Sequence, residues 1–244
     1  MIGSWDSIII DEGKMRAYVA VPAADRSAPG VVVIHGQSGV DDFTQVTHIL
    51  AGDGYVAVAP DLFHREGPDR KDDAPGRKSR LRDETVIRDV NAALQFLKAN
   101  KQVDGARLGI VGFCMGGRVV YLMASASPDL GAAVMYYGGD TMVAWGSGAS
   151  PFERTAQIRC PILGQFGEDD ENPSPADMRK LDAELTRHGK AHEFHSYAGV
   201  GHAFANLSSA KYRADVANRS WVRTFDFFAR HFGKPTAETT AKQL

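Results

Sequence analysis

The sequence predicts an α/β fold, with a mostly parallel central sheet and helices on both of its faces. From Gly30 onward, solid apolar runs of strand length recur along the chain, and helix-like segments alternate with them. Strands that are buried on both faces have such continuous apolar runs, and their alternation with helices indicates a parallel sheet. Because no internal repeat or low-complexity linker interrupts the 244 residues, we expect one domain spanning residues 1–244.

The expected elements follow in chain order. Apolar runs at residues 7–10 and 15–21 flank the turn-like segment DEGK, which indicates an opening β-hairpin. The later predicted strands are 31–34, 56–59, 108–113, 132–137, 161–166 and 193–197. The predicted helices are 85–99, 118–126, 175–188 and 210–232. Apolar residues in the first of these helices recur with a period of about 3.6 residues, as in a helix with one buried face.

A charged segment at residues 64–84 differs from the rest of the chain. It mixes both signs of charge with proline and glycine, and it has almost no apolar residue. We interpret it as a solvated loop. It follows the end of a predicted strand, however, and ligands of such folds bind beyond the carboxyl ends of the strands. A lid over a ligand site is therefore the alternative interpretation.

The composition is that of an ordinary soluble globular protein, with a formal net charge of −2 and 43% hydrophobic residues. This charge gives no general attraction for nucleic acid or an anionic membrane. The N-terminal sequence lacks a basic start followed by a long apolar run, and no stretch approaches the ~20 apolar residues of a membrane span. We therefore expect a cytoplasmic location, with the two cysteines, Cys114 and Cys160, in the reduced state.

The first chemical signal is a cysteine between glycines. Residues 112–117 are GFCMGG, and they match the strand, tight turn and helix of a nucleophile elbow with cysteine in place of serine. At the start of a helix, backbone N–H groups favour the thiolate of Cys114, and a neighbouring imidazole favours it further. The alternative is a small apolar cysteine packed at a strand end. Cys160, just before Pro161, is expected to be structural.

A nucleophile of this kind needs an orienting acid and then a base later in the chain. The acid is expected after a later strand, where GEDDENPSP offers Asp169 and Asp170. The base is expected in the loop after the last strand, and of the eight histidines only His202 combines that setting with the required order. The segment HEFH at 192–195 is no zinc motif, because its histidines are three residues apart on a predicted strand. We expect neither a metal ion nor a cofactor.

With these motifs the chain resembles the dienelactone hydrolase family, whose members are cysteine enzymes of the α/β-hydrolase fold. The resemblance extends from VVVIHG at 31–36 to TFDFFARHF in the last helix, and it includes GYVAVAPDLF, GFCMGG, YYG, FGEDDENPSP and GHAFAN. It implies an α/β-hydrolase fold with no large cap domain. By position, it implies that Cys114 is the nucleophile, His202 the base and Asp170 the orienting acid, with Asp169 as the fallback.

An oxyanion hole in this fold takes one N–H from the residue after the nucleophile and one from the loop after an early strand. These positions correspond to Met115 and to Gln37 in the HGQSG turn. The family prototypes carry a glutamate in that turn, which is implicated in controlling the resting cysteine, whereas this chain has Gly36 at the aligned position. We therefore expect a thiol that is activated directly by His202.

The substrate contacts of the prototypes are also changed in this chain. The prototypes hold a substrate carboxylate with a serine and an arginine shortly after the catalytic histidine, where this chain has Ala203 and Asn206. Arg80 and Arg82 of the charged segment are the candidates for this task. Tyr137, in the YYG stretch, is a further substrate-contact candidate.

The expected function is that of a carboxylic-ester hydrolase with a Cys–His–Asp triad, which acts on activated esters or lactones through a thioester. Because thiolate is itself a good leaving group, only substrates with a good leaving group go forward from the tetrahedral intermediate. A broad carboxylesterase or thioesterase with the same triad is the close alternative. A ligand-binding or redox-sensing protein with Cys114 as sensor is the alternative of another class, and it gives no role to His202 or Asp170. The expected partner is a small-molecule substrate.

Overall fold

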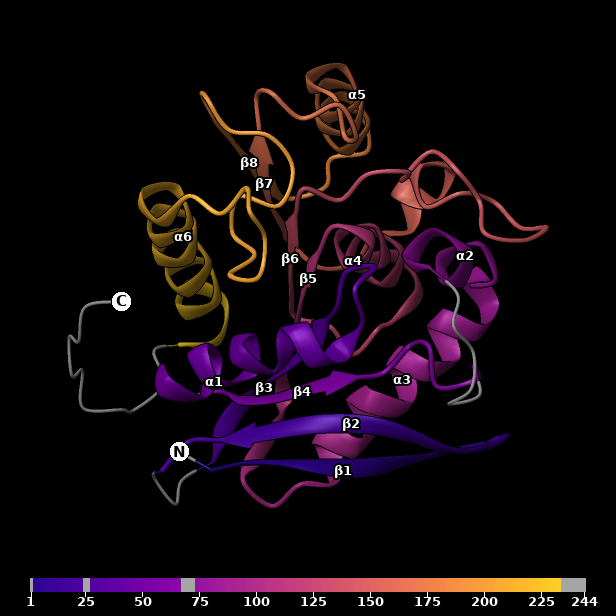
Figure 1. Ribbon diagram of the computed structural model, residues 1–244, viewed down its shortest axis with the longest axis vertical. Helices are drawn as coiled ribbons and strands as arrows, with labels where there is room; N and C mark the ends of the chain where they lie inside the picture. The colour runs from indigo at the N-terminus through magenta and orange to yellow at the C-terminus, as the bar shows by residue number, and fades with distance from the viewer. Residues whose placement is uncertain (1, 24–26, 67–72, 234–244) are drawn as a thin grey trace.

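The computed structural model describes residues 2–23, 27–66 and 73–233. Its centre is one eight-stranded sheet with the strand order β1-β2-β4-β3-β5-β6-β7-β8 (Figure 1). The strands are β1 (Ile2–Ile10), β2 (Gly13–Val21), β3 (Ala28–Ile34), β4 (Val56–Pro60), β5 (Val103–Phe113), β6 (Ala132–Tyr136), β7 (Ile162–Gly167) and β8 (His192–Tyr197). β3 to β8 pair in parallel, whereas β2 pairs antiparallel with β1 and with β4.

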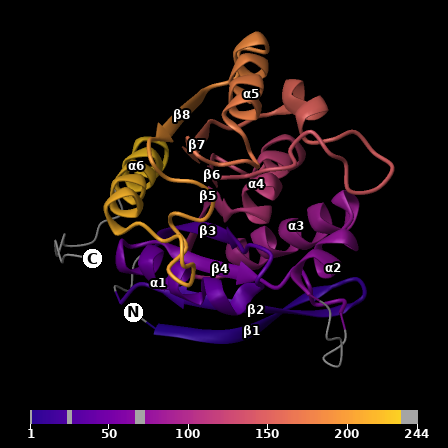
Figure 2. The same ribbon diagram turned by 45° about the horizontal axis from the view of Figure 1, so that its top comes forward.

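Helices cover both faces of this sheet, as the two views in Figures 1 and 2 show. α3, α4 and α5 contribute to the core on one face, and α1 and α6 contribute to the core on the other. The α-helices are α1 (Thr44–Gly52), α2 (Ala74–Ser79), α3 (Asp83–Ala99), α4 (Met115–Ala126), α5 (Pro175–Arg187) and α6 (Ala214–Phe232), with short 3₁₀ turns η1 (Val40–Phe43) and η2 (Phe152–Gln157). None of the described helices is long and apolar enough to cross a membrane.

The burial of the central strands explains their apolar sequences. Every residue of β3, β4, β6 and β7 is buried, because helices lie on both sides of them. α3 buries the stripe that its periodicity predicts, including Val86, Val90 and Leu94. The mostly parallel sheet, the helices on both faces and the N-terminal hairpin are thus confirmed.

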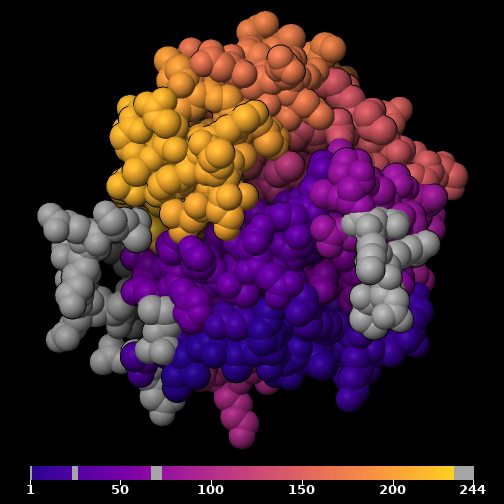
Figure 3. All heavy atoms as spheres, in the orientation of Figure 1, coloured from indigo at the N-terminus to yellow at the C-terminus, as the bar shows by residue number. Residues whose placement is uncertain are grey.

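The hairpin is longer than the sequence indicated. β1 and β2 pair along their whole length, from Ile2 opposite Val21 to Ile10 opposite Gly13. The hairpin forms one edge of the molecule. In the space-filling view of Figure 3, the described residues nearest the C-terminus, in yellow, lie against the α1 region. In the described part of the chain, no separate cap covers the sheet.

The charged segment at 64–84 is not a solvated loop throughout, so that interpretation is wrong for its second half. α2 begins after Asp73, whose side chain accepts the N–H of Gly76 at 2.9 Å and caps the helix. α3 begins at Asp83, a carboxylate that is only 4% exposed. The lid interpretation also involves residues 67–72, which lie outside the described residues.

The sheet order predicts a ligand site beyond the carboxyl ends of the strands. β3 lies between β4 and β5, so the chain adds β4 on one side of it and the later strands on the other. In open α/β sheets, ligands bind beyond the carboxyl ends of the strands at such a point. Gly36 and Cys114 follow β3 and β5 there, and Asp170 and His202 follow β7 and β8.

Candidate functional site

Cys114 lies in a sharp turn between β5 and α4. Its backbone has φ 57° and ψ −120°, a conformation that costs energy for a residue with a side chain. The flanking glycines make the turn possible. A Cβ on Gly112 would lie 2.3 Å from the carbonyl oxygen of Gly116, and a Cβ on Gly116 would lie 2.2 Å from that of Ile34. The strand, the turn and the helix are therefore in backbone contact, and they hold the thiol at a fixed point.

The surroundings of the Cys114 thiol favour its ionised form. Burial alone raises the pKa of the thiol, but the His202 imidazole and the Met115 N–H lower it by more, so the net shift is downward. The ammonium of Lys78 adds to the lowering. For Cys160, no imidazole or ammonium of the described residues lowers the pKa, and burial raises it to about 12. Of the two thiols, Cys114 is therefore the one whose surroundings favour the thiolate.

His202 and Asp170 form the next contact of the site. Nδ1 of His202 lies 2.8 Å from Oδ2 of Asp170, whose side chain is 2% exposed. Burial alone lowers the pKa of His202, but the Asp170 carboxylate and the Cys114 sulfur raise it to about 9. Since Nδ1 donates to the carboxylate, Nε2 is the ring nitrogen that remains to exchange a proton with Cys114. An imidazolium–thiolate pair is the arrangement that these shifts favour.

The structure distinguishes the two aspartates that the sequence offered. Asp169 is exposed, and its backbone N–H bonds to the carbonyl of Val200. Asp170 is the residue whose carboxylate contacts His202, and its other oxygen accepts the backbone N–H of Asn172 at 2.9 Å. The contact with His202 therefore belongs to Asp170.

Behind this carboxylate lies a second pair of side chains. Asn172 donates from Nδ2 to Oδ1 of Asp140 at 2.8 Å, and its Oδ1 accepts the Asp140 backbone N–H at 3.1 Å. The other carboxylate oxygen of Asp140 is bonded to Nζ of Lys78. These contacts connect α2 with the loop that carries Asp170, and no local sequence pattern predicts them.

Both expected oxyanion donors lie beside Cys114. Met115 is the first residue of α4, so its N–H has no intrahelical acceptor. Gln37 lies in the loop after β3, next to Gly36, and a Cβ on Gly36 would be 3.5 Å from the Cβ of Cys114. Both residues line the same cavity as Cys114.

This cavity has a volume of about 410 Å³. It is bounded by Cys114, His202 and Asp170 together with charged side chains of both signs, which include Lys78, Arg118, Lys211, Asp140 and Glu171. A second cavity of about 540 Å³ adjoins it and shares Gln37, Lys78 and Trp145 with it. The space beside the thiol can therefore accept a small polar molecule.

The expected substrate contacts are not brought to the Cys114 cavity. Arg80 donates to both carboxylate oxygens of Glu66, at 2.7 and 2.5 Å. Arg82 lines the adjoining cavity and donates to the carbonyls of Ser79 and Leu81. Tyr137 is fully buried and packs edge-on against the His202 ring, with ring centroids 5.0 Å apart. Among the described residues, none of these three lines the cavity that contains Cys114.

The cavity instead uses cations that the sequence did not single out. Lys78 lies on α2, two residues before Arg80, and lines both cavities. Arg118, one turn into α4, is fully buried and forms an ion pair with Asp83. Its place directly after GFCMGG was the available signal, because an arginine in the first turn of a buried helix requires a partner.

Comparison with known proteins finds similar sequences over most of the chain. The sequence model of the Dienelactone hydrolase family matches residues 15–232. A protein of Methylorubrum extorquens named "Putative carboxymethylenebutenolidase" is 32% identical over 233 residues, which cover 92% of this chain and 79% of the relative. A Bradyrhizobium protein named "Probable 2-oxo-3-(5-oxofuran-2-ylidene)propanoate lactonase" is 29% identical over 245 residues, with 95% of this chain and 96% of the relative covered.

A solved structure gives the same result for the fold. The crystal structure of a protein from Klebsiella pneumoniae, titled "Putative Dienelactone Hydrolase", superposes with a TM-score of 0.86. It is 30% identical in sequence, and the match covers 94% of this chain and 98% of that chain.

Proposed function

Because this chain belongs to the dienelactone hydrolase family, we propose that it hydrolyses activated esters and lactones with Cys114 as nucleophile, through a thioester. The observation that carries the proposal is that the Cys114 thiol interacts with the His202 imidazole, which in turn contacts the buried Asp170 carboxylate. The Asp170 carboxylate raises the pKa of His202, and the His202 imidazole lowers the pKa of Cys114. This is the electrostatic arrangement that an activated thiol needs.

In the first half of the proposed reaction, the Cys114 thiolate attacks the carbonyl carbon of the substrate. A sulfur–carbon bond forms, and the π electrons of the carbonyl move to its oxygen, which accepts the N–H groups of Gln37 and Met115. The oxyanion then collapses and the carbon–oxygen bond to the leaving group breaks. His202 gives its proton to the departing oxygen. The products of this half are a Cys114 thioester and an alcohol, enol or phenol, which is released from an ester and stays attached to the acyl chain when the substrate is a lactone.

In the second half, water takes the place of the leaving group. His202, now neutral, removes a proton from the water as the water oxygen attacks the thioester carbonyl. The same two N–H groups hold the second oxyanion, and the Cys114 thiolate leaves with the electrons of the sulfur–carbon bond. Asp170 keeps the His202 ring in the orientation that both halves require, through its bond to Nδ1.

The use of a thiol restricts the substrates. In the tetrahedral intermediate, the thiolate competes with the substrate's own leaving group for expulsion. Enol lactones and aryl esters go forward, because resonance stabilises their leaving oxygen, whereas amides and plain alkyl esters return to the starting materials. The proposed substrate class is therefore activated esters and lactones.

Position 36 further distinguishes this chain from the family prototypes. A Cβ at this position would lie 3.5 Å from the Cβ of Cys114, so glycine leaves no side chain at position 36 to compete with His202 for the thiol. We propose that Cys114 is reactive in the resting protein. At pH 7, iodoacetamide should alkylate Cys114 at a higher rate than it alkylates a free cysteine. An equal rate would contradict this part of the proposal.

Mass spectrometry of the intact protein tests the proposed function. Wild type is mixed briefly with an aryl ester, an enol lactone or an acyl thioester, beside Cys114→Ala, His202→Ala and the matched thiol control Cys160→Ala. We expect an acyl adduct on Cys114 that water removes, with no adduct in Cys114→Ala and an unchanged adduct in Cys160→Ala. Loss of the base should slow turnover by about 10²–10⁴-fold.

Two results would count against the proposal. One is turnover by Cys114→Ala at the wild-type rate, which would remove the cysteine from the chemistry. The other is wild-type protein that neither turns over nor acylates with any of the three substrate types. A preference for the acyl thioester over the other two would favour a thioesterase with the same residues.

A further inference from the structure

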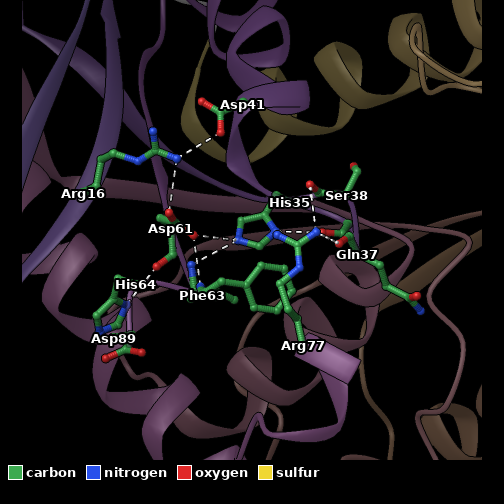
Figure 4. Close-up of polar contacts among 12 residues, drawn as sticks. Arg16, His35, Gln37, Ser38, Asp41, Asp61, Phe63, His64, Arg77 and Asp89 are labelled. Carbon is green, nitrogen blue, oxygen red and sulfur yellow. Dashed lines mark hydrogen bonds and ion pairs between the residues drawn. The ribbon is translucent and has the colours of Figure 1, made fainter. Parts of the chain in front are cut away.

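We propose that His35 is a positioning residue, which orients the Gly36–Gln37 peptide so that the Gln37 N–H faces the reacting carbonyl. This inference rests on the proposed function, because it gives one of its oxyanion donors a physical support. His35 is fully buried at the end of β3 and has no part in the contacts of Cys114, His202 and Asp170. Figure 4 shows its ring between the loop at 36–38 and the segment around Asp61.

The contacts of the two ring nitrogens fix the tautomer of His35. Nε2 accepts the backbone N–H of Leu62 at 3.0 Å, so this nitrogen carries no proton. Nδ1 lies 2.7 Å from the carbonyl oxygen of Gly36, and a carbonyl can only accept. The ring is therefore the neutral form with its proton on Nδ1, donated to Gly36.

The charges around the ring agree with a neutral imidazole. Burial lowers the pKa of His35, and the nearby guanidinium of Arg77 lowers it further. The bond to the Gly36 carbonyl and the carboxylates of Asp61 and Asp41 raise this pKa, but the Asp61 oxygen is 3.9 Å from Nε2 and the net shift remains downward.

The bond to Gly36 controls the next N–H because a peptide unit is planar. In a trans peptide the carbonyl of one residue and the N–H of the next point in opposite directions. Among the described residues the only cis peptide is Asn172–Pro173, so the Gly36–Gln37 peptide is trans. Holding the Gly36 carbonyl toward His35 thus turns the Gln37 N–H away from His35. Within the described part of the chain, that N–H has no protein acceptor, so it is free to bind an oxyanion.

Gly39 and Arg77 also donate hydrogen bonds to this loop. The Gly39 N–H returns to the Gly36 carbonyl at 3.2 Å, and Arg77 donates to the carbonyls of Gln37 and Ser38 at 3.4 and 3.5 Å. These Arg77 contacts are longer than the 2.7 Å bond from His35, and they act on later peptides. Among the described residues, His35 therefore supplies the side-chain bond to the peptide that carries the donor, beside the longer backbone bond from Gly39.

Two substitutions of His35 distinguish the roles of its two ring nitrogens. In asparagine, the amide nitrogen is as many bonds from Cβ as Nδ1 is in histidine, so His35→Asn keeps a donor for the Gly36 carbonyl and loses the acceptor for Leu62. In glutamine, the amide oxygen corresponds to Nε2, so His35→Gln keeps the acceptor and loses the donor. Each variant thus serves as the matched control for the other.

Two reactions of Cys114 report different properties of the site. Acylation by an aryl ester passes through an oxyanion and needs the Gln37 donor. Alkylation by iodoacetamide forms a sulfur–carbon bond while iodide leaves with the electrons of the carbon–iodine bond, so no oxyanion develops. The alkylation rate therefore reports the reactivity of the thiolate alone. The acylation rate reports the reactivity of the thiolate together with the stabilisation that the oxyanion hole provides.

We expect His35→Gln to acylate about 10- to 100-fold more slowly than wild type, somewhat less than the ~10²–10³ typical for complete removal of an oxyanion donor. Its alkylation rate should stay within about twofold of wild type, since the lost donor is not part of the thiolate's environment. His35→Asn should acylate within a few-fold of wild type. Wild-type acylation by His35→Gln, a parallel fall in alkylation, or equal defects in both variants would overturn the inference.

If a variant does not fold, a measurement on the wild-type protein tests the inference about His35. Nitrogen-15 NMR of the imidazole should show a neutral His35 with the proton on Nδ1 at pH 7, and a proton on Nε2 would overturn the inference. Failure of the proposed function is distinguishable, because wild type would then form no acyl adduct at all. Failure of the inference alone leaves the wild-type adduct intact.

Discussion

Arg118 is the residue whose replacement should affect the stability of the fold most directly. Its guanidinium, 0% exposed, donates to both carboxylate oxygens of Asp83 at 2.6 and 3.1 Å. It also donates to the carbonyls of Asp140, at 3.2 Å, and Val143. Its carbon Cζ lies 3.7 Å above the ring of Trp145. The substitution that tests this cluster is Arg118→Met, which keeps an unbranched apolar stem and removes every donor.

The expected cost follows from what Asp83 retains. After the substitution, the donor that the described residues leave to the buried carboxylate is the backbone N–H of Trp145, at 3.0 Å. Breaking a buried ion pair in this way costs about 3–5 kcal/mol, because an uncompensated charge remains inside. At about 2–4 °C per kcal/mol for a chain of this size, the melting temperature should fall by about 6–20 °C.

Urea unfolding measures this cost against two controls. Arg88→Met removes a surface partner of Glu12, with both side chains about half exposed, and should leave the midpoint unchanged within error. The double variant Arg118→Met with Asp83→Leu removes both charges and should recover most of the lost stability. A loss of less than about 1 kcal/mol in Arg118→Met, or a double variant no more stable than the single one, would refute the reasoning.

Three further experiments, two of them on substituted proteins, test Cys114 and its surroundings. Asp170→Asn removes the carboxylate that stabilises the His202 imidazolium, so the pH profile of Cys114 alkylation should move upward by about one pKa unit. An unmoved profile would contradict this. Because burial raises the pKa of Cys160 to about 12, iodoacetamide at pH 8 should label one thiol in the native protein and two in urea; native labelling of both would contradict it. Gly112→Ala places a Cβ 2.3 Å from the Gly116 carbonyl and should destabilise the fold by about 1–3 kcal/mol in urea unfolding, and an unchanged midpoint would be the contrary result.

The sequence indicated the neighbourhood of the site because its signals are local. GFCMGG specifies a strand, a turn and a helix within a few residues, and His202 was found by its place after the last strand. The choice between Asp169 and Asp170 was not local in this sense. Both follow β7 in one turn, and only the path of the backbone decides which carboxylate points toward His202. The catalytic roles of all three residues remain predictions that the acylation experiment tests.

The contacts that were missed connect residues far apart in the chain. Arg118 and Asp83 are separated by 35 positions, and neither has a pattern that names the other. Lys78 was passed over in favour of Arg80, although both belong to the same charged segment. Which of them lines the cavity depends on the rotation of α2 about its axis, and a six-residue helix without buried positions gives no periodicity from which to read that rotation.

The tight contact of Gly116 with the end of β3 has a consequence for how such a protein can change over generations. The two N–H groups of the proposed oxyanion hole belong to backbones that touch there, so their spacing is independent of side-chain identity at Gln37 and Met115. The cavity walls, by contrast, are side chains such as Lys78 and Trp145. Point mutations can therefore alter which molecule is admitted while the donors stay in register. Substrate preference can diverge among relatives faster than the chemistry does.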